Sequence, residues 1–507
     1  MIIMNKMFNF IKENYKYILF FFVLFFINLL FFIKQQTDNL YHVFIIISTI
    51  ISIVIVVINY KLNNTKKVKT ETIFLVCSIF IGILYVFVMP IGMAPDEAAH
   101  FRRIYEISDG HIISDKNSNG TGGRSLPVSI STTFSFDIQD GTYADEIKLI
   151  SKTRNNKTSN FQTFGNTSLY SPICYIPQVL GTVVGKILHL PMIFIVYLAR
   201  LFNLAAWIAI MYFSIKYIPT GKLFISLLLL SPISMQAAAS CQADALTNCI
   251  AIGLISFVLY KIKQQKKLTK NEKIIMTLLA IVMSMCKIVY IPLCLLLYLI
   301  PDKCFQNKKD KYIKITGLAV FVIIINLIWL LISSTYLVEF QPGVNSMEQV
   351  KYILKAPIYY LKVLHSTYDN YGIYYLLTST GSYLGYFNIH LSETYILFYV
   401  MFIIYTALRE NNKKKLILNQ FQKIFVTLIL ISCFLLISTS LYVQWTAVGE
   451  IMISGIQGRY FIPLIPLLLL LLGSKDLESK KDNRIYVYMF IYLINIYALM
   501  MIIAYYV

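Results

Sequence analysis

Long runs of apolar residues that carry no charge are the feature that most restricts how this chain can fold. Residues 17–33 and 41–58 form two such runs, and similar runs recur along the rest of the sequence. Uncharged apolar runs of about 18 residues or more are long enough to cross a bilayer as helices. Hydrophobic residues make up 57% of the chain, which exceeds the roughly 45–50% of a soluble domain. The sequence therefore predicts an all-α polytopic membrane protein.

The positive charge of the chain indicates its orientation in a membrane rather than a nucleic-acid partner. The formal net charge is +20, but most of the lysines and arginines lie in short segments between apolar runs. Such a distribution sets membrane topology, because basic loops are retained on the cytoplasmic side. We therefore expect the lipid bilayer as a partner and no binding of nucleic acid.

Alternation of apolar runs and basic loops predicts about thirteen transmembrane helices in a multi-pass protein of the cell membrane. Lys6, Lys12 and Lys16 precede the first run, which places the N-terminus in the cytoplasm. The expected crossings lie at residues 17–33, 41–58, 72–91, 192–215, 223–239, 244–260, 274–300, 315–335, 394–408, 424–443, 460–473 and 485–507, with two helices in 274–300.

The apolar stretch at 274–300 is counted twice because basic loops flank it on both sides. Lysines at 261–273 precede it and lysines at 303–314 follow it, so both ends are expected in the cytoplasm. Two short helices, broken near Lys287 or Pro292, satisfy this condition. One long crossing that violates the charge rule at one loop is the alternative.

Two long polar segments are expected on the outer side of the membrane. They are the outer loop 92–190 and the outer segment 336–393. The loop 92–190 holds the densest group of residues typical of catalytic sites, so an active site there would be extracytoplasmic.

Residues 94–112 (APDEAAHFRRIYEISDGHI) predict a short helix with an acidic start. Pro95 suits the first helical position, and acidic residues in the first turn interact favourably with the helix dipole. Asp96 and His100 are four residues apart and share one face of the helix, with Arg103 one turn further on. An ordinary capped and solvated helix would show the same spacing.

Several chemical roles are open to this helix. The carboxylate of Asp96 could act as a general base towards an acceptor hydroxyl. Asp96, Glu97 and His100 could together bind a divalent cation, although a carboxylate pair and one histidine make a small ligand set. Arg102 or Arg103 could pair with a phosphate group.

Ionisable residues in or beside the apolar runs are candidate functional residues, because charge at membrane depth is costly. Asp244 begins one expected span, Lys287 lies at the expected helix break, and Arg459, followed by Tyr460, flanks the last outer loop. Basic side chains that approach the outer half of the bundle would suit a lipid phosphate. Interfacial snorkelling, or a structural ion pair between Asp244 and Lys287, is the alternative.

Four stretches together carry a family resemblance. Residues 94–113, 231–248, 378–393 and 455–468 match, in order, the motifs of a bacterial membrane family of unknown function, domain of unknown function 2142. The resemblance covers roughly residues 70–505, and it implies that residues 1–70 are a two-span N-terminal addition to a membrane core at 71–507, of which 92–190 is the first outer loop. This family is in turn similar to the glycosyltransferase C superfamily, whose multi-span enzymes use lipid-phosphate-linked sugars and place a catalytic acidic residue in the first outer loop of the core.

That resemblance implies a fold of the glycosyltransferase C type and a role for each candidate residue. Asp96 would be the catalytic base, supported by Glu97 and His100. Arg459 would lie near the donor phosphate, with Lys287 as a second candidate. The short tail of the chain leads us to expect no large soluble C-terminal domain of the kind that some members of the superfamily have.

The sequence therefore predicts a membrane glycosyltransferase that moves a sugar from a polyprenyl-phosphate donor to a glycan, lipid or protein acceptor of the cell envelope. Arg102, Arg103, Asp244, Lys287, Arg459 and Tyr460 are the expected substrate-binding residues. A transporter or flippase for lipid-linked polysaccharide, or a polysaccharide polymerase, is the alternative function.

Overall fold

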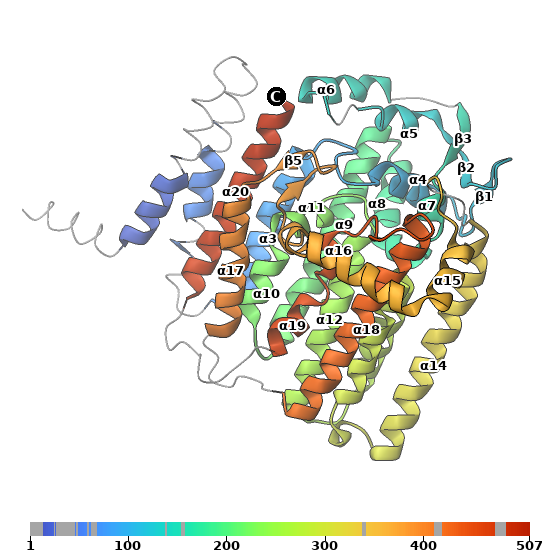
Figure 1. Ribbon diagram of the computed structural model, residues 1–507. Helices are drawn as coiled ribbons and strands as arrows, with labels where there is room; N and C mark the ends of the chain where they lie inside the picture. Colours follow the sequence, from blue (N-terminus) through green and yellow to red (C-terminus); the bar gives the residue numbers. More distant parts are fainter. Residues whose placement is uncertain are drawn as a thin grey trace, which may run out of the picture.

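The computed structural model describes residues 14–24, 26, 46, 49–57, 60–61, 68–136, 139–153, 158–336, 341–409, 418–471 and 483–507. Most of these residues are helical, and the long helices run side by side in a bundle (Figure 1). The spans expected at 17–33 and 41–58 lie partly outside the described residues.

Six helices within the described residues are long and apolar enough to cross a membrane. This composition agrees with an all-α membrane protein, whereas the expected total of about thirteen crossings stays a prediction. The six are α3 (Thr70–Val88), α9 (Met192–Tyr217), α12 (Asp244–Gln264), α14 (Lys308–Ser333, extended by the 3-10 turn η4, Ser334–Tyr336), α18 (Gln420–Trp445) and α20 (Arg484–Tyr506).

Shorter helices lie between these six. Pro232 begins one of them directly after another has ended, because proline lacks the N–H that would continue the preceding helix. The shorter helices are α10 (Lys222–Leu229), α11 (Pro232–Ala238), α13 (Lys270–Cys286), α17 (Glu393–Arg409) and α19 (Ile465–Leu471), with the 3-10 helices η2 (Ile288–Leu299), η3 (Asp302–Cys304) and η5 (Gly458–Phe461).

The expected break in the stretch 274–300 is confirmed. α13 ends at Cys286 and η2 begins at Ile288, so the break falls at Lys287, whose backbone is extended at φ −150° and ψ 116°. Both ends of the resulting hairpin lie together, because the Leu268 N–H donates to the Cys304 carbonyl at 2.8 Å. The stretch therefore forms a hairpin, and the single long helix considered as the alternative is wrong.

The connections 89–191 and 341–392 meet at one end of the bundle, which we call the loop face (Figure 1). At Gly385, for example, a Cβ would lie 3.1 Å from Met93 Cε of the first connection. The first connection holds α4 (Glu97–Ser108), α5 (Val128–Thr133), α6 (Tyr143–Lys152), α7 (Gly165–Ser168), η1 (Pro172–Tyr175) and α8 (Ile176–Ile187), and the second holds α15 (Ser346–Lys355) and α16 (Pro357–Thr378).

Two small antiparallel sheets add strands that the all-α prediction did not contain. The first has the order β1-β2-β3 and pairs Gly123 with Thr163. At Gly123 a Cβ would lie 2.4 Å from the Gln162 carbonyl oxygen, so only glycine fits this pairing. The strands are β1 (Asp115–Lys116), β2 (Gly122–Pro127), β3 (Ser159–Thr163), β4 (Tyr383–Leu384) and β5 (Ile389–His390).

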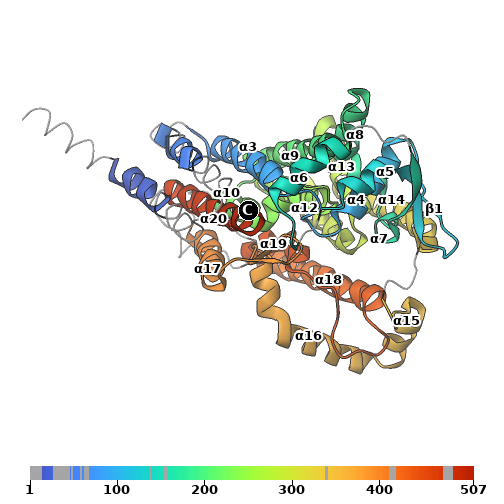
Figure 2. The ribbon, with the colours of Figure 1, turned by 90° about the horizontal axis from the view of Figure 1, so that it is seen from above.

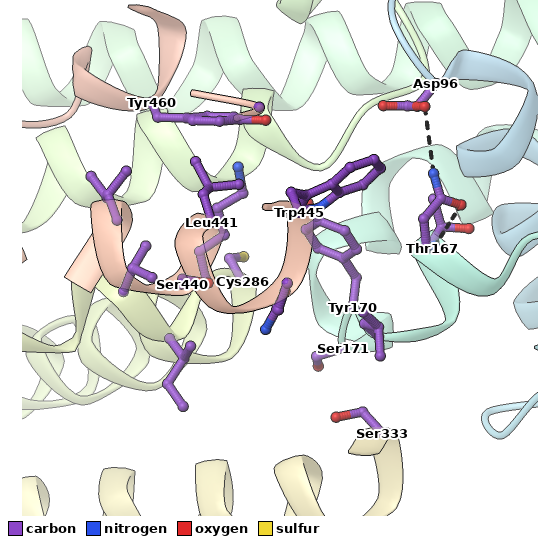
Figure 3. A pocket seen from close by; sticks show the side chains of 18 of the residues that line it. Asp96, Thr167, Tyr170, Ser171, Cys286, Ser333, Ser440, Leu441, Trp445 and Tyr460 are labelled. Carbon is purple, nitrogen blue, oxygen red and sulfur yellow. Dashed lines mark hydrogen bonds between the residues drawn. The ribbon is translucent and has the colours of Figure 1, made fainter. Parts of the chain in front are cut away.

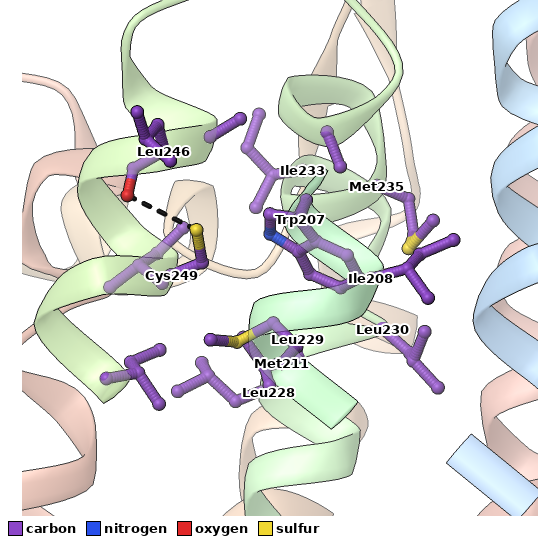
Figure 4. Packing of buried hydrophobic residues seen from close by; sticks show 14 of the residues in the cluster. Trp207, Ile208, Met211, Leu228, Leu229, Leu230, Ile233, Met235, Leu246 and Cys249 are labelled. Atoms are coloured by element: carbon purple, nitrogen blue, oxygen red, sulfur yellow. Dashed lines mark hydrogen bonds between the residues drawn. The ribbon is translucent and has the colours of Figure 1, made fainter. Parts of the chain in front are cut away.

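Burial divides the long helices into a central and a peripheral group. In α12, 89% of the residues in the most apolar stretch are buried. Leu246 and Cys249 of this helix pack near Trp207 and Met211 of α9 (Figure 4). The same measure is 17% in α14 and 28% in α18, which lie at the edge of the bundle when it is seen from above (Figure 2). Apolar helices with so much exposed surface are suited to face lipid.

Candidate functional site

A cavity of about 400 Å³ lies between the start of α4, the break after α13, and the helices α14 and α18 (Figure 3). This volume falls within the range of small-molecule sites, about 300–1,000 Å³. Asp96, His100 and Lys287 contribute its acidic and basic side chains, and Tyr460 also lines it. The other large lining residues include Tyr170, Trp329, Tyr386, Phe387, Leu441 and Trp445.

Asp96 occupies the position directly before α4, with a left-handed backbone at φ 60°. Aspartate tolerates this conformation better than most residues, and the turn directs its carboxylate towards the cavity (Figure 3). Asn166 Nδ2 donates to Asp96 Oδ1 at 3.4 Å, a long hydrogen bond. Within the described part of the chain no second residue hydrogen-bonds this carboxylate, so it is available to a ligand.

The electrostatic surroundings of Asp96 favour its protonated form. Burial raises the pKa of Asp96 above its ordinary 3.8, Arg459 opposes this change, and Asp244 adds to it. A carboxylate with a raised pKa is a stronger base than a solvated aspartate, which suits proton abstraction from a hydroxyl group. The cavity thus holds an accessible carboxylate whose pKa is raised.

His100 lies one helical turn beyond Asp96 and also lines the cavity. Its Nδ1 is 2.7 Å from the Tyr175 hydroxyl, and its ring meets the Tyr170 ring edge-on at 5.6 Å. Burial lowers the pKa of His100 to about 3, with Asp244 opposing the shift and Arg459 and Lys287 adding to it. The imidazole is therefore neutral near pH 7 and acts as a hydrogen-bonding group rather than a cation.

A cluster of one carboxylate and two cations lies beside the cavity, and of its three residues only Lys287 lines the cavity, while Asp244 and Arg459 lie behind it. Asp244 Oδ1 lies 2.6 Å from Lys287 Nζ, and Asp244 Oδ2 lies 3.2 Å from Arg459 Nε. The ion pair between Asp244 and Lys287, one of the alternatives raised by the sequence, is thus present. Lys287 also lies 4.4 Å from the centre of the Tyr460 ring, a cation–π contact.

Arg459 keeps hydrogen-bonding capacity in this cluster. Its contact with Asp244 is an ion pair without hydrogen-bond geometry, and the buried Nε finds no hydrogen-bond partner among the described residues. The other nitrogen contact is long, with NH1 at 3.5 Å from Gln242 Oε1. The Nε faces the Asp244 carboxylate and Arg459 itself does not line the cavity, so what this guanidinium contributes there is positive charge close behind the wall, which favours an anionic ligand.

Glu97 points away from the cavity, unlike its neighbour Asp96. Both of its oxygens accept from Arg200, with Nε at 2.8 Å and NH2 at 2.7 Å. The backbone N–H groups of Cys241 and Gly92 each donate to the same carboxylate at 2.9 Å. With four donors and no exposed surface, Glu97 holds α4 to α9 and to the segment before α12.

The two arginines of α4 also lie outside the cavity lining. Arg103 is fully buried and pairs with Glu106, while its NH2 donates to the Ile112 carbonyl at 2.7 Å. Arg102 Nε donates to Gln162 Oε1 of β3 at 3.1 Å. The prediction that Arg103 shares the face of Asp96 and His100 is therefore wrong. Its partners Glu106 and Ile112 hold the guanidinium on a side of α4 that does not face the cavity.

The set Asp96, Glu97 and His100 does not converge on one point. Asp96 and His100 face the cavity, whereas Glu97 faces Arg200. Among the described residues no group of three or more histidine, cysteine, aspartate or glutamate side chains is placed to hold a metal ion. These residues therefore do not form the cation site that the sequence suggested for them.

Several residues that line the cavity belong neither to the acidic helix nor to the charged positions that the sequence singled out. Trp329 and Trp445 belong to peripheral helices, and Tyr170 follows α7. Phe387 has a left-handed backbone at φ 65°, which is unusual for an aromatic residue. Its neighbour Tyr386 also lines the cavity. Only the structure brings these side chains to the cavity.

Together these features define a multi-helix membrane protein with a charged and aromatic cavity near one end of its bundle. A family model described as "Predicted membrane protein (DUF2142)" matches residues 79–468, which is more than half of the chain. The chain therefore belongs to this family, in agreement with the motifs at 94–113, 231–248, 378–393 and 455–468. No curated protein and no solved structure matched the chain.

Proposed function

We propose that this protein is an inverting glycosyltransferase that moves a sugar from a polyprenyl-phosphate donor to a glycan, lipid or protein acceptor of the cell envelope. One observation carries the proposal. The accessible carboxylate of Asp96 and the ammonium group of Lys287 line the same cavity, with the guanidinium of Arg459 behind it. Transfer from a lipid phosphate needs a base on one side of the sugar and cations on the other.

The reaction would proceed by direct displacement at the anomeric carbon. Asp96 accepts the proton of the acceptor hydroxyl as the acceptor oxygen bonds to that carbon. The bond between the anomeric carbon and the phosphate oxygen breaks, and its electron pair remains on the leaving lipid phosphate. Lys287 and Arg459 stabilise the additional negative charge, because preformed cations in a site that excludes water cost little reorganisation.

The donor lipid would occupy the side of the cavity between α14 and α18. Asn326 and Ser333 of α14 both line the cavity, so it extends about 10 Å along this helix. Ile437, Ser440 and Leu441 contribute the wall from α18. Because the outer surfaces of α14 and α18 are apolar and exposed, a prenyl chain could leave the cavity directly into the acyl chains.

The loop face would be extracytoplasmic and the N-terminus cytoplasmic. Lysines concentrate at the opposite end of the bundle, around the connection between α12 and α13 and at the start of α14. Basic loops remain on the cytoplasmic side during insertion, so this distribution supports the orientation. The acceptor would then approach from the cell envelope.

The test uses the full-length protein in proteoliposomes with a panel of tritiated polyprenyl-phosphate sugars and an envelope extract as acceptor. We expect transfer with the unmodified protein and with Asp145→Asn, a control in α6 of the same loop. Asp96→Asn should lower the transfer rate about 10²–10⁴-fold. Full transfer by Asp96→Asn, or movement of the donor across the bilayer without transfer, would overturn the proposal in favour of another base or a flippase.

A second measurement tests the cations. Binding of undecaprenyl phosphate can be followed by native mass spectrometry of the protein in micelles. Loss of one charged hydrogen bond is worth about 1.5–3 kcal/mol, so Lys287→Met should weaken binding about 10–100-fold. Asp96→Asn should bind the lipid phosphate at least as well as the unmodified protein, because it removes a negative charge near the phosphate. Equal binding by Lys287→Met would contradict the assignment.

A further inference from the structure

An exposed apolar stripe runs along α15 and into the first turns of α16. Met347, Val350 and Leu354 are spaced as i, i+3 and i+7 on α15, so they lie on one face of the helix. Ile358 and Leu361 continue the apolar surface on α16. Leu354 is 76% exposed and Ile358 is 71% exposed, values that a water-soluble surface rarely shows for neighbouring large residues.

α15 has three distinct sides. One side packs on the bundle, where the buried Gln349 accepts a hydrogen bond from the Gly449 N–H at 3.1 Å. The second side is the apolar stripe. The third carries Lys351, which pairs with Glu348 at 2.8 Å, and Lys355. A helix with one apolar and one basic exposed side is typical of segments that lie in the surface of a bilayer.

Contacts with α18 fix the level of these two helices. Gln349 contacts the loop that follows the end of α18. Further along, the Tyr360 hydroxyl lies 2.7 Å from Thr439 Oγ1 and the Tyr368 hydroxyl lies 2.8 Å from Ser438 Oγ. Thr439 precedes the last residue of α18, Trp445, by about 9 Å along the axis.

The end of α18 marks the expected boundary of the bilayer on this side. α18 is an apolar helix long enough to span the membrane, and it ends at Trp445. α15 therefore lies where α18 leaves the membrane, and the start of α16 lies slightly deeper. Interfacial helices bury their apolar face about 5–10 Å into the boundary between headgroups and acyl chains.

We propose that α15 and the first two turns of α16 form an anchor in the bilayer surface at the loop face. Met347, Val350, Leu354, Ile358 and Leu361 insert among the acyl chains. Lys351, Lys355 and Lys362, against the single acidic residue Glu348, contact the phosphates of anionic phospholipids. The anchor does not depend on the proposed sugar transfer, since it requires only that the protein spans a membrane.

The anchor also bears on the cavity. Gln341, five residues before α15, lines the cavity, and α15 packs beside the end of α18, which forms one cavity wall. A helix held at the level of the lipid headgroups thereby keeps the cavity and Lys287 at a fixed depth relative to lipid phosphates. A lipid-linked substrate could then present its phosphate to the cavity without leaving the bilayer.

Quenching of a fluorescent label tests the depth of the stripe. Leu354→Cys and Lys355→Cys, adjacent on α15 but on different sides, are labelled with an environment-sensitive fluorophore in full-length protein in nanodiscs. The eight native cysteines are buried, and the unsubstituted protein measures their background labelling. We expect doxyl-labelled lipid to quench position 354 several-fold more strongly than position 355, and aqueous iodide to show the reverse order.

Two outcomes would overturn the anchor. If iodide quenches both positions equally, the stripe lies in water. If neither quencher reaches position 354, a protein surface, such as a second copy of the chain, covers it instead.

A lipid exchange tests the basic side separately. In nanodiscs that contain phosphatidylglycerol, the label at position 354 should be quenched more strongly by doxyl lipid than in pure phosphatidylcholine. The triple variant Lys351→Gln, Lys355→Gln, Lys362→Gln should abolish this difference. Quenching that is independent of the lipid in the protein with all three lysines would contradict the contact with anionic headgroups.

Discussion

The Asp244 carboxylate lies 2.6 Å from the Lys287 ammonium group, and this contact joins the start of α12 to the break between α13 and η2. A broken helix leaves backbone groups that must be buried by protein or water at membrane depth. The charge of Lys287 is balanced at the same point by Asp244, with Arg459 as the second cation. The break and the ion cluster are therefore parts of one structural feature beside the cavity.

Removal of Asp244 should destabilise the fold more than removal of an exposed acidic partner. In Asp244→Asn the mostly buried Lys287 and Arg459 lose their counter-charge, a change that typically costs about 3–5 kcal/mol. Asp302→Asn is the matched control, since Asp302 pairs with Lys311 at 2.9 Å but is half exposed, and its loss should stay below about 1 kcal/mol. Denaturant unfolding in micelles measures both.

The double variant Asp244→Asn, Lys287→Met tests whether the two residues act on each other. When Lys287 is also replaced, Asp244→Asn leaves only Arg459 without a counter-charge. The double variant should therefore be about 0.5–3 kcal/mol more stable than the sum of the two single losses predicts. Simple additivity of the two single losses would show that the ion pair contributes no coupling.

Stability should depend on pH through His100. The pKa of this residue falls from 6.5 to about 3 in the folded protein because its ring is buried. Between these pH values the unfolded chain binds more protons than the folded chain, so the stabilisation is full above about pH 6.5 and is lost as the pH falls towards 3. His100→Gln should flatten this part of the profile, measured as unfolding midpoints at pH 7 and pH 5. An unchanged slope in His100→Gln would refute the assignment.

The sequence predicted the parts of the fold that depend on local composition. Apolar runs located the long helices, and the basic loops on both sides of 274–300 predicted the break that is found at Lys287. A similar argument placed Asp96 and His100 on one side of a short helix, and both line the cavity. These features follow from charge and periodicity within a few tens of residues.

Features that depend on distant contacts could not be predicted in this way. Glu97 and Asp96 are adjacent and chemically alike, but only Glu97 meets Arg200, which comes from α9. Arg103 similarly turns to Glu106 and to the Ile112 carbonyl once the loop has folded back. The sequence grouped these residues because nothing in their spacing specifies which partner each one meets.

Glu97 and Asp96 should therefore respond differently to the same substitution. Glu97→Gln leaves the buried Arg200 without its counter-charge and should lower the free energy of unfolding by about 3–5 kcal/mol. Asp96→Asn removes only one long hydrogen bond from Asn166 and should change stability by less than about 1 kcal/mol. Unfolding midpoints in micelles compare the two variants directly, and equal losses would show that Asp96 also has a structural role.

The pH dependence of sugar transfer should identify Asp96 as the base. Because burial raises the pKa of Asp96 above 3.8, transfer should decline as the pH falls through this raised value, since the protonated carboxyl group cannot accept the proton of the acceptor. Arg459 opposes the shift through its positive charge. Arg459→Gln should therefore move the acidic limb of the rate profile to higher pH, beyond its effect on donor binding. Rates measured at saturating donor separate these two effects. A limb that stays in place in Arg459→Gln would mean that a different group, outside the field of Arg459, controls the proton transfer.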